Sequence, residues 1–213
     1  MKIAVLGATG LTGLQVVKVA LEQGHEVSAV VRNPSNITQQ HNNLKVIEAN
    51  LFDEASVTKA LEGQEAVVSC LGFNRNPQPV TGYTNSAKTL LPAMRKNNIS
   101  RIVLMTAWYT DLKSASHGGF LINWLLVPFL KPKLTNMREM EVLLEETAQD
   151  INYTVVRPPG LTNNPPTGSP VKTQEDFVVD NESGRVSRAD VADFMISCLK
   201  TNLYDRKMVA MTL

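Results

Sequence analysis

The sequence predicts one doubly wound α/β domain built on a mostly parallel sheet. Short apolar runs alternate with helical segments from the first residue onward. Several of these runs are apolar almost throughout, as strands are when helices cover both faces of a sheet. The chain has 213 residues, which suits one domain with a buried core, so residues 1–213 are expected to form a single unit.

Periodicity and turn residues place the elements of the first half. Lys2–Leu6 is a β-rich run that ends at a glycine, and Leu11–Gln23 has apolar residues at helical spacing until Gly24 stops it. A helix is expected from the cap Asp53 through Glu62, because an aspartate side chain accepts hydrogen bonds from the free N–H groups of a helix start. The other apolar runs are expected to be strands: Glu26–Val31, Leu44–Glu48 and Ala66–Cys70.

The second half continues the alternation. We expect strands at Arg101–Met105, Tyr153–Val156 and Met208–Met211. We expect helices at Val80–Lys96, Met137–Thr147 and Ser187–Leu199, the last with Ser187 as its N-cap. Residues 107–133 and 157–185 are expected to be loops on the substrate side, since open α/β sheets bind ligands at the carboxyl ends of their strands.

Composition excludes several classes of protein. Lys and Arg number 21 against 20 Asp and Glu, and this near-neutral balance without a basic block argues against a nucleic-acid partner. The three histidines are widely spaced and there is no CxxC pair, so no metal site is expected. Cys70 and Cys198 lie in apolar runs and are expected in the core. With no signal peptide recognisable, a reducing, cytoplasmic setting is expected.

The clearest motif is the run Gly7-Ala8-Thr9-Gly10-Leu11-Thr12-Gly13, between a strand and a helix. Its first glycine allows the turn off the strand, its second lets the backbone approach a pyrophosphate, and its third allows close helix–sheet packing. The helix start then offers free N–H groups and partial positive charge to phosphates. With a strand before and a helix after, the motif predicts dinucleotide binding rather than a glycine-rich turn without a ligand.

Arg32, directly after the second strand, predicts the cofactor. Proteins that bind NAD usually have Asp or Glu there to hold the ribose 2′-hydroxyl. An arginine instead pairs with a 2′-phosphate, through a charge-assisted bond of about 1.5–3 kcal/mol. We therefore expect NADP(H) to be preferred roughly ten- to a hundredfold. The alternative is a solvated surface arginine.

Several segments together carry a family resemblance: GATGLTG, VVRN, SCLG, LMTA, VVRPPG and SRADVADFM. The chain resembles the atypical short-chain dehydrogenase/reductases, and more narrowly the NADPH-dependent flavin reductases, also called biliverdin-B reductases. NmrA-like proteins share the GATGxTG and VRPPG-like segments. The resemblance implies a Rossmann fold that binds NADP(H).

The resemblance also implies site residues. The pyrophosphate would be lined by Gly7, Thr9, Gly10, Leu11, Thr12 and Gly13. The 2′-phosphate would be held by Arg32 and Ser35, and the adenine flanked by Asn50, in place of the family's usual Asp, and Leu51. The cofactor's ribose region would be crossed by Leu71, Gly72 and Phe73, and the nicotinamide bordered by Thr106, Pro158, Pro159 and Gly160.

The residues expected to act on a substrate are fewer. Carbonyl-reducing relatives use a Tyr-x-x-x-Lys pair on a helix. Tyr109 and Lys113 have this spacing, but they fall in a loop directly after a strand, so we interpret the match as accidental. The flavin reductases commonly have Ser and His where this chain has Ala107 and Gly160. A flat conjugated acceptor such as a flavin, a quinone or a biliverdin-like molecule is therefore expected, with a non-catalytic NADP(H) sensor or scaffold as the alternative.

Three aromatic residues and one arginine lie near the expected substrate. Phe73, Trp108 and Tyr109 form either a stacking wall for a flat molecule or packing beneath a loop. Arg157 either binds an anionic substrate group or ties the loop to the sheet.

The apolar run Phe120–Leu130 is too short to span a membrane, which takes about 20 residues, so no transmembrane segment is expected. It is a lid, a dimer contact, a membrane-surface patch or a core helix. A monomer or weak dimer is expected.

Overall fold

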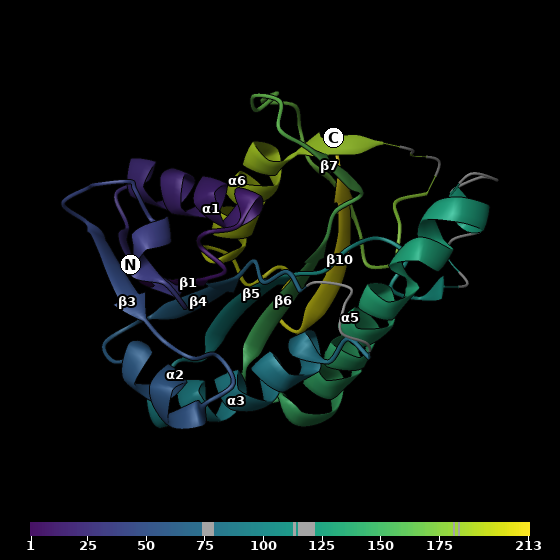
Figure 1. Cartoon of the computed structure of the whole chain (residues 1–213). Coiled ribbons are helices and arrows are strands. Elements are labelled where there is room, and N and C mark those ends of the chain that lie inside the picture. The colour runs from purple at the N-terminus through teal and green to yellow at the C-terminus, as the bar shows by residue number, and fades with distance from the viewer. Residues whose placement is uncertain (74–78, 113, 115–121, 181, 183) are drawn as a thin grey trace.

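A computed structural model of the chain describes residues 1–73, 79–112, 114, 122–180, 182 and 184–213. Its main sheet has eight strands in the order β3-β2-β1-β4-β5-β6-β10-β8 (Figure 1). The strands of this sheet are β1 (Lys2–Leu6), β2 (Glu26–Val31), β3 (Leu44–Glu48), β4 (Ala66–Ser69), β5 (Arg101–Met105), β6 (Asn152–Arg157), β8 (Lys172–Gln174) and β10 (Lys207–Thr212). All neighbours are parallel except β8, which is antiparallel to β10.

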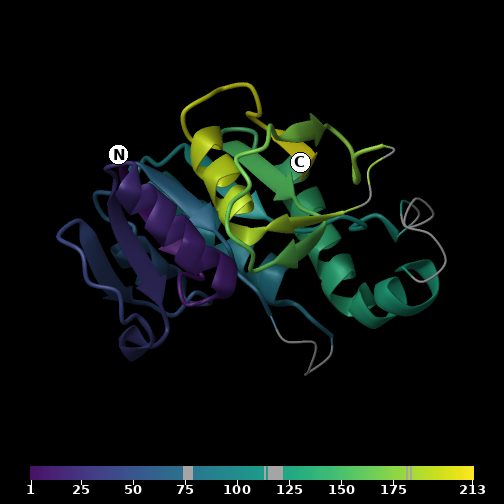
Figure 2. The same cartoon turned by 90° about the horizontal axis from the view of Figure 1, so that it is seen from above.

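Helices cover both faces of the sheet. They are α1 (Leu11–Glu22), α2 (Glu54–Ala60), α3 (Gly82–Lys96), α5 (Val127–Thr147) and α6 (Arg188–Cys198). Helices α1 and α6 pack on one another over one face, and α2, α3 and α5 cover the other (Figures 1 and 2). The predicted doubly wound fold is confirmed.

The alternation of side chains along β1 shows how the two layers are built. Ile3 and Val5 pack into the cluster beneath α1 and α6. Ala4 and Leu6 pack into the cluster beneath α2, α3 and α5. Because successive strand residues point to opposite faces, a strand buried on both sides is apolar at every position.

Both predicted caps are present. Ser187 Oγ accepts a hydrogen bond from the Asp190 N–H at 3.0 Å, and Asp53 Oδ1 accepts one from the Ala55 N–H at 3.1 Å. Cys70 and Cys198 are free and buried, and burial raises the pKa of each thiol to about 12. Both cysteines are core residues, as expected.

Helix α5 corrects the expectation for the apolar run Phe120–Leu130. A π-helical turn at Ile122–Leu126 leads directly into α5, so the helix begins well before the expected Met137. The second half of the expected loop 107–133 is therefore helical. Pro128 lies in the first turn of α5, the part of an α-helix that best tolerates a proline. Lys113 and residues 115–121 lie outside the described residues.

The segment 157–185 was expected to be a loop, but it contains short strands. Gly160–Thr162 (β7) pairs with Arg185–Ser187 (β9), and β8 extends the main sheet beside β10. Three-residue strands such as Lys172-Thr173-Gln174 carry no apolar periodicity, so main-chain pairing with a neighbour decides their conformation. In the described part of the chain, none of the helices has the length and apolar character needed to cross a membrane.

Gly13 gives the first testable prediction. Alanine in a helix is favoured over glycine by about 1 kcal/mol, but a Cβ at Gly13 would lie 2.1 Å from the Gly7 carbonyl oxygen. We expect Gly13→Ala to lower the free energy of unfolding by about 1–3 kcal/mol, since overpacking outweighs propensity. Denaturant unfolding measures the loss.

Gly72→Ala is the matched control, because a Cβ there meets no atom within 4 Å. Equal stability of the Gly13→Ala and control variants would show that α1 can move away from β1 without cost.

Candidate functional site

A cavity of about 510 Å³ opens at the carboxyl ends of β1, β2, β4 and β5. The strand order reverses between β1 and β4, and open α/β sheets bind ligands at such a switch point. Its described lining residues are Gly7, Thr9, Gly10, Leu11, Thr12, Val30, Val31, Arg32, Leu51, Phe52, Cys70, Leu71, Gly72, Phe73, Tyr83, Met105, Thr106, Ala107, Met137, Leu161 and Arg188.

One end of the cavity is the glycine-rich loop. Gly7 has a φ of +75°, and a Cβ there would lie 2.7 Å from the Cys70 carbonyl oxygen. The N-cap of α1 is Gly10, which has no side chain to bond the first N–H groups, and the first turn has no acidic residue. These free donors and the positive end of the helix dipole fit a pyrophosphate. Gly13 is not a lining residue; it acts by letting α1 approach β1.

Two arginines line the cavity. Arg32 follows β2 directly, as the sequence predicts for a 2′-phosphate partner. Arg188, the first residue of α6, lines it as well and donates to Asn163 Oδ1 at 2.7 Å. Ser35 does not line it; the Ser35 N–H and hydroxyl both donate to Asn33 Oδ1, which caps the short 3₁₀ helix Pro34–Asn36 (η1) beside Arg32.

The residues after β3 border the next part of the cavity. Leu51 and Phe52 line it, and the Phe52 ring is half exposed with its centroid 6.0 Å from that of Phe73. The Asn50 side chain does not line the cavity, because Asn50 Oδ1 accepts the Phe52 N–H at 3.1 Å in a local turn. Asn50 therefore acts in turning the backbone, and Leu51 and the half-exposed Phe52 ring line this part of the cavity.

The far end of the cavity is mostly apolar. Phe73, Ala107 and Met137 line it together with Thr106. The Phe73 ring meets that of Tyr83 edge to face, with centroids 4.9 Å apart at 84°. Burial raises the pKa of Tyr83, so its hydroxyl stays protonated at neutral pH. This end suits a flat, apolar ring system.

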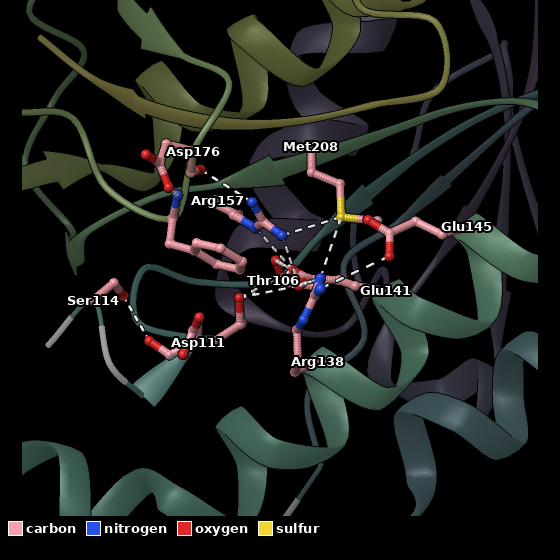
Figure 3. A network of polar contacts seen from close by, with 11 residues as sticks. Thr106, Asp111, Ser114, Arg138, Glu141, Glu145, Arg157, Asp176 and Met208 are labelled. Carbon is pink, nitrogen blue, oxygen red and sulfur yellow. Dashed lines mark hydrogen bonds and ion pairs between the residues drawn. The ribbon is translucent and has the colours of Figure 1, made fainter.

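A buried ionic network lies behind Thr106 (Figure 3). Glu141 of α5 has no exposed surface, and it accepts hydrogen bonds from Thr106 Oγ1 at 2.9 Å and from Thr110 Oγ1 at 3.1 Å. Arg157, at the end of β6, donates from Nε at 3.0 Å and from Nη2 at 2.7 Å to the two carboxylate oxygens. One carboxylate thereby joins the ends of β5 and β6 to α5.

Arg157 is a correction to the substrate-binding expectation. It is only 3% exposed, its guanidinium is bound to Glu141, and it donates to the Asp176 carbonyl at 3.0 Å. The Phe177 ring covers it, with the Arg157 Cζ 4.3 Å from the ring centroid. It cannot reach an anionic substrate, and it ties the 157–185 segment to the sheet, which was the other interpretation.

Trp108 and Tyr109 also lie outside the cavity lining. Trp108 is 4% exposed and packs against Val178, Val179 and Ala210, beneath the 157–185 segment. The Tyr109 ring stands edge to face on that of Trp108. The stacking-wall expectation is therefore wrong for these two residues, while Phe73 and Ala107 do line the cavity.

The Pro-Pro-Gly turn lies outside the described lining of the cavity. Pro158 and Pro159 are buried, and the Pro158 carbonyl accepts the Trp108 N–H at 2.9 Å. Gly160 begins β7. None of the three is a lining residue, so the turn supports the loop after β5 instead of bordering the cavity directly.

Sequence reasoning missed two important side chains. Glu141 is four residues after Met137 and three before Leu144, on the inward face of the helix, and a buried acid must be paired. This helical spacing was the signal that could have predicted a buried, paired glutamate. Arg188 is the residue after the N-cap Ser187, at a helix start where a basic side chain is unfavourable unless it binds an anion.

The fold and the phosphate-binding loop define a dinucleotide-binding protein. Residues 7–202 match the model of a family described as NAD(P)H-binding, so the chain belongs to this NAD(P)H-binding family.

The chain is similar in sequence to curated proteins and in fold to solved structures. An uncharacterised chloroplastic protein of Arabidopsis thaliana is 28% identical over 210 residues, covering 93% of this chain and 71% of its own. The crystal structure of a putative exported protein from Burkholderia pseudomallei is 26% identical, covers 100% of both chains and has a TM-score of 0.79. A short-chain dehydrogenase/reductase from Veillonella parvula, solved with NADP, has the same fold at 17% identity, with a TM-score of 0.75 over 100% of this chain and 94% of its own.

The Glu141–Arg157 pair gives a prediction on stability. Glu141→Gln leaves the buried Arg157 guanidinium without a full countercharge, and breaking a buried pair typically costs about 3–5 kcal/mol. We expect a loss of that size in the free energy of unfolding by denaturant titration.

The control removes an exposed pair of the same kind. Asp150→Asn breaks the bond to Arg95, whose side chain is 40% exposed, and is expected to cost less than about 1 kcal/mol. If Glu141→Gln and Asp150→Asn lowered the free energy of unfolding by the same small amount, the buried network would not be holding α5 against the sheet.

Proposed function

We propose that the protein is an NADPH-dependent oxidoreductase that reduces a flat, conjugated acceptor such as a flavin or a quinone. The observation that carries this proposal is the continuity of the cavity. It runs from the free N–H groups of α1 to an apolar end lined by Phe73, Ala107 and Met137. A dinucleotide and a planar acceptor can therefore lie in one continuous space.

Arg32 supports NADP(H) over NAD(H). Arg32 lines the cavity at the end of β2, where an acidic residue would favour an unphosphorylated ribose. Arg188 lines the same cavity and adds a second positive charge for the phosphates.

The reduction itself needs little from the side chains. NADPH, when bound, supplies the hydride. Thr106 lines the cavity but donates its hydroxyl proton to Glu141, so toward the cavity its oxygen acts as an acceptor. None of the described lining residues is a lysine, which disfavours the Tyr–Lys route to an alcohol. A conjugated acceptor can delocalise the incoming charge and take its proton from water, so positioning supplies much of the rate.

The second candidate function is a non-catalytic NADP(H) sensor or scaffold, as in the NmrA-like proteins. Ala107 favours it, because a methyl group lines the cavity where the resembled flavin reductases commonly have a serine. A biliverdin-like acceptor is the least supported of the flat molecules for the same reason.

We also propose a reducing compartment, the cytoplasm, as the place where the protein works. Cys70 and Cys198 are both free and buried. Cys70 follows β4, Cys198 ends α6, and both belong to the core cluster beneath α1 and α6, where they act as small apolar side chains.

The catalytic proposal predicts turnover. NADPH oxidation followed at steady state is expected to rise above the uncatalysed rate with FMN, riboflavin or a simple quinone, and Ala107→Phe is expected to abolish the increase by filling the apolar end. Absence of turnover with all three acceptors, alongside normal NADPH binding, would favour the sensor.

Arg32 predicts which cofactor binds. Arg32→Ala is expected to weaken NADPH binding about ten- to a hundredfold and NADH binding little, because only NADPH carries the 2′-phosphate. Fluorescence titration of both cofactors measures this. Arg188→Ala is the matched variant, because the second lining arginine begins α6 and its loss should weaken the binding of both cofactors alike. Equal losses for both cofactors in Arg32→Ala would contradict the assignment.

A further inference from the structure

The N-terminal end of α5 exposes a cluster of large apolar side chains. Trp124 is 76% exposed, Leu125 69%, Leu126 45% and Phe129 58%. They come from the π-helical turn and the first turn of α5, so they share one end of one helix. We call these four residues the α5 tip. Soluble domains rarely expose apolar side chains in such a group unless the group binds something.

The α5 tip is anchored and projects outward. Val127 and Leu134 bury their side chains against Tyr109 and Leu112, which fixes the helix to the loop after β5. Figures 1 and 2 both show this end of α5, in teal, standing out from the side of the domain. The tip therefore lies at a projecting end of α5, its four large apolar side chains are exposed, and the helix beside them is packed against the domain.

The tip and the helical turn that follows it carry charge of one sign in the sequence. No acidic residue lies between Asp111 and Glu139, and Lys131 and Lys133 follow Phe129 within four residues. Arg138, further along α5, is paired with Glu141 and Glu145. The chain as a whole carries a formal net charge of only +1, so this excess is local. Exposed aromatic and leucine side chains beside lysines are the combination that binds anionic lipid surfaces.

We propose that the α5 tip binds the surface of an anionic lipid bilayer. Trp124, Leu125 and Phe129 enter the interface, and Lys131 and Lys133 lie at the level of the headgroups. A second copy of the chain fits the tip less well. A symmetric dimer brings the same patch of each copy together, so the two pairs of lysines would face one another. The inference does not depend on which acceptor the cavity takes.

Vesicle co-sedimentation of the full chain tests the proposal. We expect sedimentation with vesicles of phosphatidylcholine and phosphatidylglycerol, and at least about tenfold weaker binding to phosphatidylcholine alone. The chain has two tryptophans, and Trp108 is buried, so a blue shift of tryptophan emission on binding reports Trp124. Trp124→Ser with Phe129→Ser, and separately Lys131→Glu with Lys133→Glu, should each weaken vesicle binding by about tenfold or more.

Matched controls separate the tip from general surface effects. Leu203→Ser removes an apolar side chain that is 61% exposed elsewhere, and Lys45→Glu with Lys88→Glu removes two exposed lysines on other elements. Both should leave vesicle binding unchanged, and NADPH titration of every variant shows whether it is folded. Binding that is insensitive to lipid charge and to both tip variants would overturn the proposal. The proposal would also be overturned if the chain bound no vesicles and light scattering showed a dimer that Trp124→Ser with Phe129→Ser abolished. The occupant of the tip would then be a second copy of the chain.

Discussion

The close approach of α1 to the end of β1 sets the geometry of the whole carboxyl edge of the sheet. A Cβ at Gly13 would lie 2.1 Å from the Gly7 carbonyl oxygen, and one at Gly7 would lie 2.7 Å from that of Cys70. Only glycines let three backbone segments meet this closely, and their meeting directs the free N–H groups of α1 into the cavity. The position of the phosphate-binding end, and with it the path that we propose for a dinucleotide past Arg32 and Leu71, follows from this contact.

The other end of the cavity depends on a different interaction, the buried pair of Glu141 and Arg157. Burying two charges is costly unless every remaining polar atom is bonded. Here Thr106, Thr110 and the Asp176 carbonyl supply those bonds. The network holds α5 against the ends of β5 and β6, and it turns the Thr106 proton away from the cavity. The same network therefore keeps the Arg157 guanidinium and the Thr106 hydroxyl proton from the cavity, whose end beside Ala107 and Met137 is mostly apolar.

The regular elements were predictable from sequence, and the irregular ones were not. Strands β1 and β5 are apolar after their first residue because both faces of the sheet are buried there. The caps Ser187 and Asp53 mark helix starts by side-chain chemistry. The start of α5 was missed because Pro128 and Pro132 interrupt the helical spacing of its apolar residues. Strand β8 was missed because only main-chain pairing with β10 makes it a strand. Arg157 and Trp108 were placed near the substrate because they follow strand ends. Whether such a side chain points into a cavity or behind it depends on its tertiary partners. The partner of Arg157 is Glu141, and that of Trp108 is Val178.

A crystal structure of the chain with NADP⁺ tests the central claim most directly. We expect the pyrophosphate against the N–H groups of residues 10–12, the 2′-phosphate within hydrogen-bond distance of Arg32, and one face of the nicotinamide open toward Phe73, Ala107 and Met137. An open face of this kind is what hydride transfer to a planar acceptor needs. A nicotinamide covered by side chains on both faces, or directed out of the cavity, would contradict the account of this protein as a reductase.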